Sequence, residues 1–305
     1  MYIINHDTFL APSYRISPFR TCDIAFNKHL PFDNEIDGYF KSRFKEREFT
    51  YTLSGRSALN MALKYYNLQK DDLVTILTTT GNFYISSCVT KEIEKYCKWS
   101  RNFESKTKLI LVNHEFGYLF EDIIKLKEHD LPIIEDCAHS FFSKDKDCMA
   151  GTIGDFVIYS FPKIFPIQIG GLLVSKKSIH DDEFKFIDMN TMQYIKKVLS
   201  FYIRQKDDII SKRIYNYKYL RDQLSAQGLY ERFELRSGIV PGVFMFKANE
   251  QTIDLPRLKE HMQKHGIESS VFYDESSFFL PVHQNLGIDD LDYFIHCLRN
   301  FIVNK

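Results

Sequence analysis

Short apolar runs alternate with amphipathic stretches along the first half of the chain, and this alternation limits the fold more than any other feature. The apolar runs have the length and composition of buried strands and lie at Leu73–Leu77, Lys108–Val112, Leu131–Ile134, Phe156–Phe161 and Leu172–Ser175. Strands that alternate with helical segments are typical of an α/β domain. We therefore predict a large domain over residues 1–178, with a mostly parallel sheet flanked by helices.

Helices are predicted where apolar residues recur at helical spacing, first from Ala58 to Leu63 and again over 119–127. After residue 178 the alternation gives way to longer helical patterns around a single strand. The expected elements of this part are a helix over 209–224, a strand over 243–246, a helix over 255–262 ended by Gly266, and a helix over 288–302. They predict a smaller C-terminal α+β domain over residues 179–305.

Charge and cysteine content exclude several classes of protein. The 305 residues carry 40 Lys plus Arg against 40 Asp plus Glu, so no nucleic-acid or anionic-membrane partner is expected. No stretch approaches the roughly 20 apolar residues of a membrane span. The six cysteines are scattered without CxxC spacing. We expect neither a disulfide scaffold nor a metal site, and we expect reduced cysteines in the cytoplasm.

Polar residues that could bind a ligand or take part in catalysis follow the ends of two predicted strands. Open α/β sheets form their ligand sites at these ends. Asp136 and His139 follow one strand, and Ser160 and Lys163 close another. A buried lysine amine can form a Schiff base with an aldehyde cofactor. A carboxylate can keep a pyridine nitrogen protonated, which makes the ring an electron sink. Taken singly, each of these residues is more often a solvated or core residue than part of a site.

Two further segments complete the pattern. Ser54-Gly55-Arg56-Ser57 is a small turn that opens a helix, where backbone N–H groups and the helix dipole can bind a phosphate. An ordinary helix cap would have the same sequence. Phe83, in the segment after the first strand, could stack on a cofactor ring, although an aromatic residue is more often part of a core.

At these residues the chain resembles the DegT/DnrJ/StrS family of sugar aminotransferases, which has the aspartate aminotransferase fold type and uses pyridoxal 5'-phosphate. Five motifs occur in the family's order and cover most of the chain. They are the turn 54–59, His-Glu-Phe-Gly at 114–117, Glu-Asp-Cys-Ala-His at 135–139, the block from Gly154-Asp155 through Ser160 and Lys163 to Gly170-Gly171, and Leu-Pro-Val-His at 280–283 followed by Asp289-Asp290.

The resemblance implies a role for each matching residue. Lys163 would hold the cofactor and shuttle the proton, and Asp136 would pair with the pyridinium nitrogen. His139 would contact the ring or its phenolic oxygen. The phosphate would be bound by Gly55, Arg56, Ser57 and Ser160. The family moves an amino group, usually from L-glutamate, to a keto group of a nucleotide-linked sugar for surface polysaccharides, and it works as a homodimer.

The chain also departs from the family. The family's Gly-x-Asn-x-Arg loop, which reaches into the neighbouring subunit's phosphate site, has no clear match, and Asn190 and Arg204 are the candidates for it. A non-catalytic member that binds only cofactor or partner therefore stays an alternative. A lyase of the cysteine desulfurase kind needs a cysteine in a late loop, but Cys297 lies in a predicted helix. A dehydratase variant would carry histidine in place of Lys163.

Overall fold

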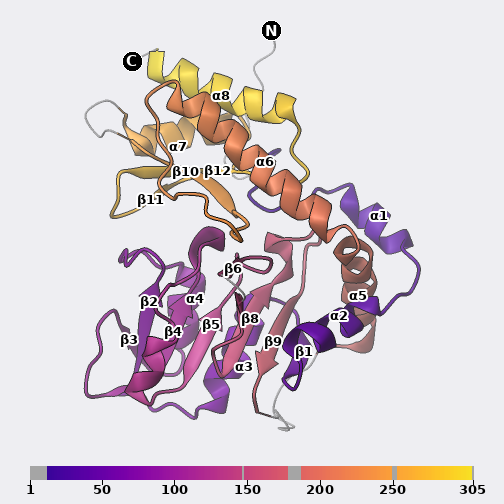
Figure 1. Cartoon of the computed structure of the whole chain (residues 1–305), viewed down its shortest axis with the longest axis vertical. Coiled ribbons are helices and arrows are strands. Elements are labelled where there is room, and N and C mark those ends of the chain that lie inside the picture. Colours follow the sequence, from indigo (N-terminus) through magenta and orange to yellow (C-terminus); the bar gives the residue numbers. More distant parts are fainter. Residues whose placement is uncertain (1–11, 146–147, 178–186, 249–252, 304–305) are drawn as a thin grey trace.

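The large half of the molecule is a sheet with helices on both faces (Figure 1). The computed structural model describes residues 12–145, 148–177, 187–248 and 253–303. Within these residues the sheet has seven strands in the order β1 (Glu48–Thr52), β9 (Gly171–Ser175), β8 (Phe156–Ser160), β5 (Ile133–Asp136), β4 (Thr107–Asn113), β2 (Leu73–Thr78) and β3 (Lys98–Ser100). From β8 to β3 all neighbours are parallel, whereas β9 is antiparallel to both β8 and β1. The predicted α/β fold class is confirmed.

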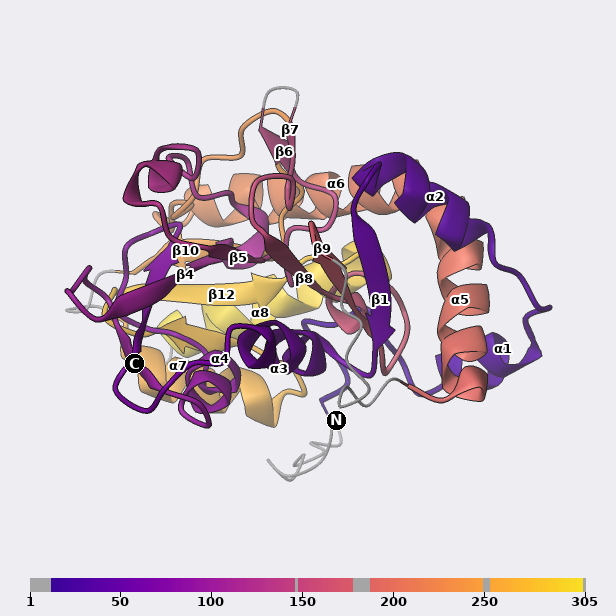
Figure 2. The ribbon, with the colours of Figure 1, turned by 90° about the horizontal axis from the view of Figure 1, so that it is seen from below.

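Alternate side chains of the central strands enter two separate cores, as a strand with both faces covered requires. On β8, Phe156 and Ile158 pack with α3 (Gly55–Tyr65) and α4 (Ser87–Ile93), and Val157 and Tyr159 pack on the opposite face. That second core includes residues of α2 (Glu35–Phe44) and α5 (Met189–Ile203). Figure 2 shows α2 and α5 beside β1, next to the short α1 (Asp23–His29).

The small half lies at the end of the large sheet where the parallel strands finish (Figure 1). Its antiparallel sheet has the order β10 (Val243–Lys247), β12 (Ser277–Pro281) and β11 (Ser270–Phe272). Three helices pack with this sheet around one core: α6 (Lys206–Ser225), α7 (Leu255–Lys264) and α8 (Ile288–Val303). A hairpin of β6 (Lys144–Asp145) and β7 (Cys148–Met149) projects from the large half. The predicted domain boundary between residues 178 and 179 stays a prediction.

One predicted element differs in kind. The helix expected over 119–127 is a series of turns ending in a short 3-10 helix, η2 (Lys125–His129). Ile123 and Leu126 are buried there, but Ile124 is 63 % exposed, so only part of the apolar pattern faces a core. Asp130, with a φ of 52°, ends the segment in the left-handed region. Among the described helices, none has both the length and the apolar content needed to cross a bilayer.

Candidate active site

A cavity of about 220 Å³ lies between the two halves, at the carboxyl ends of the parallel strands. The large half contributes side chains that follow β4, β5 and β8, and the small half closes the cavity with aromatic side chains. Among the lining residues are Asn113, Glu115, His139, Lys163, Phe272 and Phe279. Two residues predicted to be catalytic, His139 and Lys163, thus face one cavity.

Lys163 ends the short 3-10 helix η3 (Phe161–Lys163), which continues directly from β8. Its side chain is half-buried and lines the cavity. Burial holds the pKa of His139 well below its usual range, and the charges of Lys163 and Arg213 lower it further. His139 is therefore neutral at pH 7, with its ring 5.7 Å from that of Phe116. A neutral imidazole can both donate and accept a hydrogen bond in the cavity.

Asp136 is the last residue of β5 and is buried. Its Oδ1 accepts the Ala138 N–H at 3.0 Å, and its Oδ2 accepts the Asn113 side-chain amide at 3.2 Å. Burial raises the pKa of Asp136, while the Ala138 N–H and the charge of Lys163 oppose that rise. A second positive charge nearby, such as a protonated pyridine nitrogen, would stabilise the ionised carboxylate.

The predicted phosphate turn lies against the end of β8. Ser54 caps α3 by accepting the Ser57 N–H at 3.2 Å. A Cβ on Gly55 would lie 3.1 Å from the Cβ of Ser160, and a Cβ on Gly171 would lie 2.5 Å from the carbonyl carbon of Ser54. Such close approach requires glycine at position 171, because the atoms it would meet belong to the backbone. The structure thereby brings Gly55 against Ser160, and the turn against Gly171.

Arg56 connects the turn to α4. Its Nη2 donates to the Cys88 Sγ at 2.7 Å. Burial raises the pKa of the Cys88 thiol, but the hydrogen bond and charge of Arg56, a hydrogen bond with Ser86 and the charge of Lys163 outweigh burial and hold it below its usual value. Cys88 therefore lies close enough to both Arg56 and Lys163 to feel their charges.

Phe83 is placed differently from the other predicted residues. Its side chain is 63 % exposed, and its ring lies 6.2 Å from that of Trp99. The next residue, Tyr84, lines the cavity instead and packs against Phe272 and Tyr273 of the small half. The structure thus does not bring Phe83 to the cavity, and its predicted stacking role stays untested.

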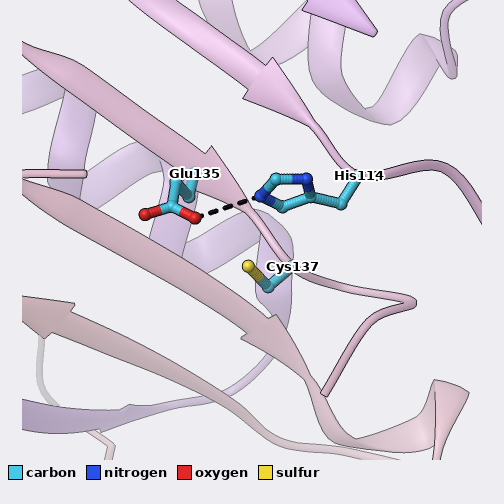
Figure 3. Close-up of side chains that lie close together, drawn as sticks. All are labelled: His114, Glu135 and Cys137. Atoms are coloured by element: carbon cyan, nitrogen blue, oxygen red, sulfur yellow. Dashed lines mark hydrogen bonds and ion pairs between the residues drawn. The ribbon is translucent and has the colours of Figure 1, made fainter. Parts of the chain in front are cut away.

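His114, Glu135 and Cys137 form a buried cluster at the ends of β4 and β5 (Figure 3). The His114 Nδ1 accepts the Phe120 N–H, so the Nε2 carries the proton and donates to Glu135 Oε2 at 3.0 Å. Each Glu135 oxygen accepts two hydrogen bonds, the others coming from the N–H groups of residues 151, 153 and 154. With its lone pairs occupied by donors, this carboxylate has no site left for a cation.

Burial tends to raise the pKa of Glu135, but the His114 bond and the backbone donors hold it below its usual value.

The two candidates for the missing interface loop are placed elsewhere. Asn190 lies in the first turn of α5, and Arg204 at its end pairs with Asp33 and Glu35 of the same chain. Cys297 is buried in α8.

Comparison with known proteins decides the family. A family model described as "Putative PLP-dependent aminotransferase" matches residues 36–250, which include every predicted site residue. The chain belongs to this family. Pyridoxal phosphate as the predicted cofactor is thereby confirmed at the level of the family, and a similar solved structure, an E. coli GDP-4-keto-6-deoxy-D-mannose-3-dehydratase, carries bound hydrated PLP.

Individual relatives also support the resemblance to sugar aminotransferases. GDP-perosamine synthase of Escherichia coli O157:H7 is 31 % identical over 168 residues, which are 47 % of this chain and 45 % of that protein. A Micromonospora echinospora protein described as "Putative L-glutamine:3-amino-2,3-dideoxy-scyllo-inosose aminotransferase" is 30 % identical over 48 % of this chain and 40 % of its own length. The matches thus span less than half the length of these curated relatives.

Solved structures show the same fold at low identity. The aminotransferase TlmJ from Streptoalloteichus hindustanus superposes with a TM-score of 0.75 at 15 % identity, over 92 % of this chain and 94 % of that one. A DegT DnrJ EryC1 StrS aminotransferase from Brucella abortus gives 0.68 at 16 %, with the same coverage. The resemblance to the DegT/DnrJ/StrS family that the sequence motifs predict is confirmed.

The described residues fit pyridoxal phosphate. Gly55 and Gly171 leave the phosphate turn without side chains that would fill it, and Lys163 faces the cavity near a buried carboxylate. Sequence reasoning did not assign Asn113, Glu115 or Arg213 to the site. Asn113 could have been found by the rule that found Asp136, because it too ends a parallel strand.

Proposed function

We propose that this chain is a pyridoxal-phosphate-dependent aminotransferase that moves an amino group, from L-glutamate, to a keto group of a nucleotide-linked sugar. The observation that carries the proposal is the convergence of Lys163, His139 and the Asp136–Asn113 pair at one sheet edge, beside a glycine-containing turn suited to phosphate. The names of the relatives, GDP-perosamine synthase among them, support a sugar substrate. We propose surface polysaccharide synthesis in the cytoplasm as the setting.

We propose the following roles for the site residues. Lys163 holds the cofactor through its Nζ and moves the proton at that atom. Asp136 pairs with the ring nitrogen, and His139, being neutral, offers a hydrogen bond to the ring or its phenolic oxygen. Gly55, Arg56, Ser57 and Ser160 bind the phosphate. When bound, pyridoxal phosphate supplies the electron sink on which amino-group transfer depends.

Borohydride reduction of the cofactor-loaded protein tests the attachment site. Peptide mapping by mass spectrometry should place the pyridoxyl group on Lys163, and Lys163→Ala should bind the cofactor only noncovalently. Lys144, exposed in the β6 hairpin, provides the matched control, and Lys144→Ala should label as the wild type does. A pyridoxyl group on any other lysine contradicts the proposal. A protein that stays colourless with added cofactor supports the non-catalytic alternative.

We also propose that two copies of the chain form a homodimer around the phosphate turn. Leu53, directly before the turn, is 52 % exposed, and Arg56 within it is exposed as well. An exposed apolar side chain at the rim of a phosphate site suits a covering protein surface better than water. Light scattering at micromolar concentration should give the dimer mass, and a monomer that retains the cofactor would contradict this.

A further inference from the structure

Arg213 is a buried arginine that has no carboxylate partner among the described residues. It lies in the middle of α6, its side chain has no exposed surface, and burial lowers its pKa to about 10. Among the ion pairs of the described residues, none includes Arg213. A guanidinium removed from water without a carboxylate is costly, so its hydrogen bonds have to compensate.

Two of its hydrogen bonds end on the turn that carries Lys163, and another, from Nη1, ends on the Pro241 carbonyl oxygen at 3.4 Å. The Arg213 Nη2 donates to the Lys163 carbonyl oxygen at 3.0 Å and, at 3.5 Å, to that of Ile164. The Nε donates to the Gln284 Oε1 at 2.9 Å, and the Gln284 Nε2 in turn donates to the Ile164 carbonyl at 2.8 Å. Two planar side chains from the small half therefore hold two successive carbonyls of the large half.

The whole segment is held in the same manner. Ser17 donates to the Pro162 carbonyl at 2.6 Å, and Asn27 donates to that of Pro166 at 2.7 Å. This segment joins β8 to β9, and the short η3 is its one regular element within the described residues. Among the described side chains that bond this segment, Arg213 is the one that bonds the backbone of Lys163 itself.

We propose that Arg213 is a positioning residue for Lys163, whose buried guanidinium fixes the lysine backbone so that the amine points into the cavity. The planar fork of arginine suits this task, because it reaches the carbonyls of Lys163, Ile164 and Pro241 and the Gln284 oxygen in one fixed geometry. A lysine at position 213 could keep the charge but not the fork. The position of Lys163 then depends on the packing of α6 against the large half. This inference rests on the proposed function, since it assumes that Lys163 receives the cofactor.

The test compares the rate of covalent attachment with folding. Purified cofactor-free protein is mixed with pyridoxal phosphate, quenched with borohydride at intervals, and the pyridoxyl-Lys163 peptide is quantified. We expect attachment to be slower by on the order of tenfold to a hundredfold in Arg213→Met, because a misplacement of about 1 Å can cost that much. Arg213→Lys should fall between Arg213→Met and the wild type. The visible circular dichroism of the bound cofactor should weaken in the same order, because it reports the orientation of the ring.

Asn27→Ala is the matched control. It removes a buried hydrogen bond from the same segment, but three residues beyond Lys163. We expect it to lower the urea midpoint while the attachment rate and the dichroism per bound cofactor stay those of the wild type. If Arg213→Met does not fold, Gln284→Ala replaces it, with a smaller slowing expected in the same direction.

The outcomes separate the two proposals. If the wild type gains no pyridoxyl group on Lys163, the proposed function is wrong and this inference is wrong with it. If the wild type is labelled and the Arg213 variants attach cofactor at its rate with the same dichroism, only the positioning role is wrong, and Arg213 is then a structural residue.

Discussion

Replacement of Glu135 by glutamine is expected to destabilise the cofactor-free protein strongly. The carboxylate accepts four hydrogen bonds: from His114 at 3.0 Å, from Gly151 at 3.1 Å, from Ile153 at 2.7 Å and from Gly154. A glutamine keeps one oxygen and presents an NH₂ group to the other two donors. Each buried donor left without an acceptor costs about 1–3 kcal/mol, so Glu135→Gln should lose about 2–6 kcal/mol of unfolding free energy.

Urea unfolding followed by circular dichroism at 25 °C measures this loss. The control is Glu121→Gln, which breaks an exposed 2.7 Å ion pair with Arg236 and should cost less than about 1 kcal/mol. If the two variants lost similar amounts of unfolding free energy at neutral pH, the conclusion that Glu135→Gln leaves two buried donors without an acceptor would be wrong. If zinc raised the midpoint of the wild type but not of Cys137→Ser, the cluster would be a metal site after all.

The same variant has a predictable pH dependence. Glu135 has a pKa below its usual value in the folded protein, so its contribution is present above the unfolded pKa of about 4 and lost as the pH falls through the lower folded value. The stability difference between the wild type and Glu135→Gln should therefore shrink on acidification below about pH 4. A difference that grows there would mean that the carboxylate is protonated in the native state.

Three further predictions concern the site. Burial raises the pKa of Glu115 in the folded protein, so the wild type loses stability as the pH rises through that folded pKa. In urea unfolding, Glu115→Gln should therefore be more stable than the wild type at pH 8 and similar to it at pH 4. Gly171→Ala should weaken cofactor binding in an absorbance titration, because the new Cβ would meet the backbone of Ser54. The control Gly38→Ala, in α2 with open space around it, should gain about 0.5–1 kcal/mol of stability. Asp136→Asn should keep the fold and much of the cofactor but lose most transamination in a coupled assay.

The parallel core of the large sheet is predictable from the sequence because strands buried on both faces are continuous apolar runs. β2, β4, β5, β8 and β9 all lie within about two residues of their predicted places. β1 escapes prediction because its Glu-Phe-Thr-Tyr-Thr sequence is an edge strand with polar positions, which local pattern does not separate from the charged run before it. The turns over 119–127 show the opposite error, since helical spacing alone does not bury every apolar residue.

Contacts between distant segments explain why part of the site is not predictable. Tyr84 rather than Phe83 faces the cavity because Tyr84 packs on Phe272 and Tyr273, almost two hundred positions away. Arg213 did leave a local signal. It lies at helical spacing with Ile209 and Tyr217, on the buried face of α6. A charged residue on such a face indicates a side chain that makes hydrogen bonds inside the protein.

Glu135 and Asp136 are neighbouring carboxylates at the end of β5, and we propose a structural role for Glu135 and a cofactor-binding role for Asp136. Successive residues of a strand point to opposite faces of the sheet, so the two neighbouring carboxylates meet different surroundings. Glu135 accepts four hydrogen bonds, which occupy its lone pairs and keep its pKa low. Asp136 accepts two from described residues, and burial raises its pKa. A carboxylate with unused lone pairs and a raised pKa gains most from a bound cation, so Asp136 is suited to a protonated cofactor ring, and Glu135, already satisfied, holds the strand end that presents it.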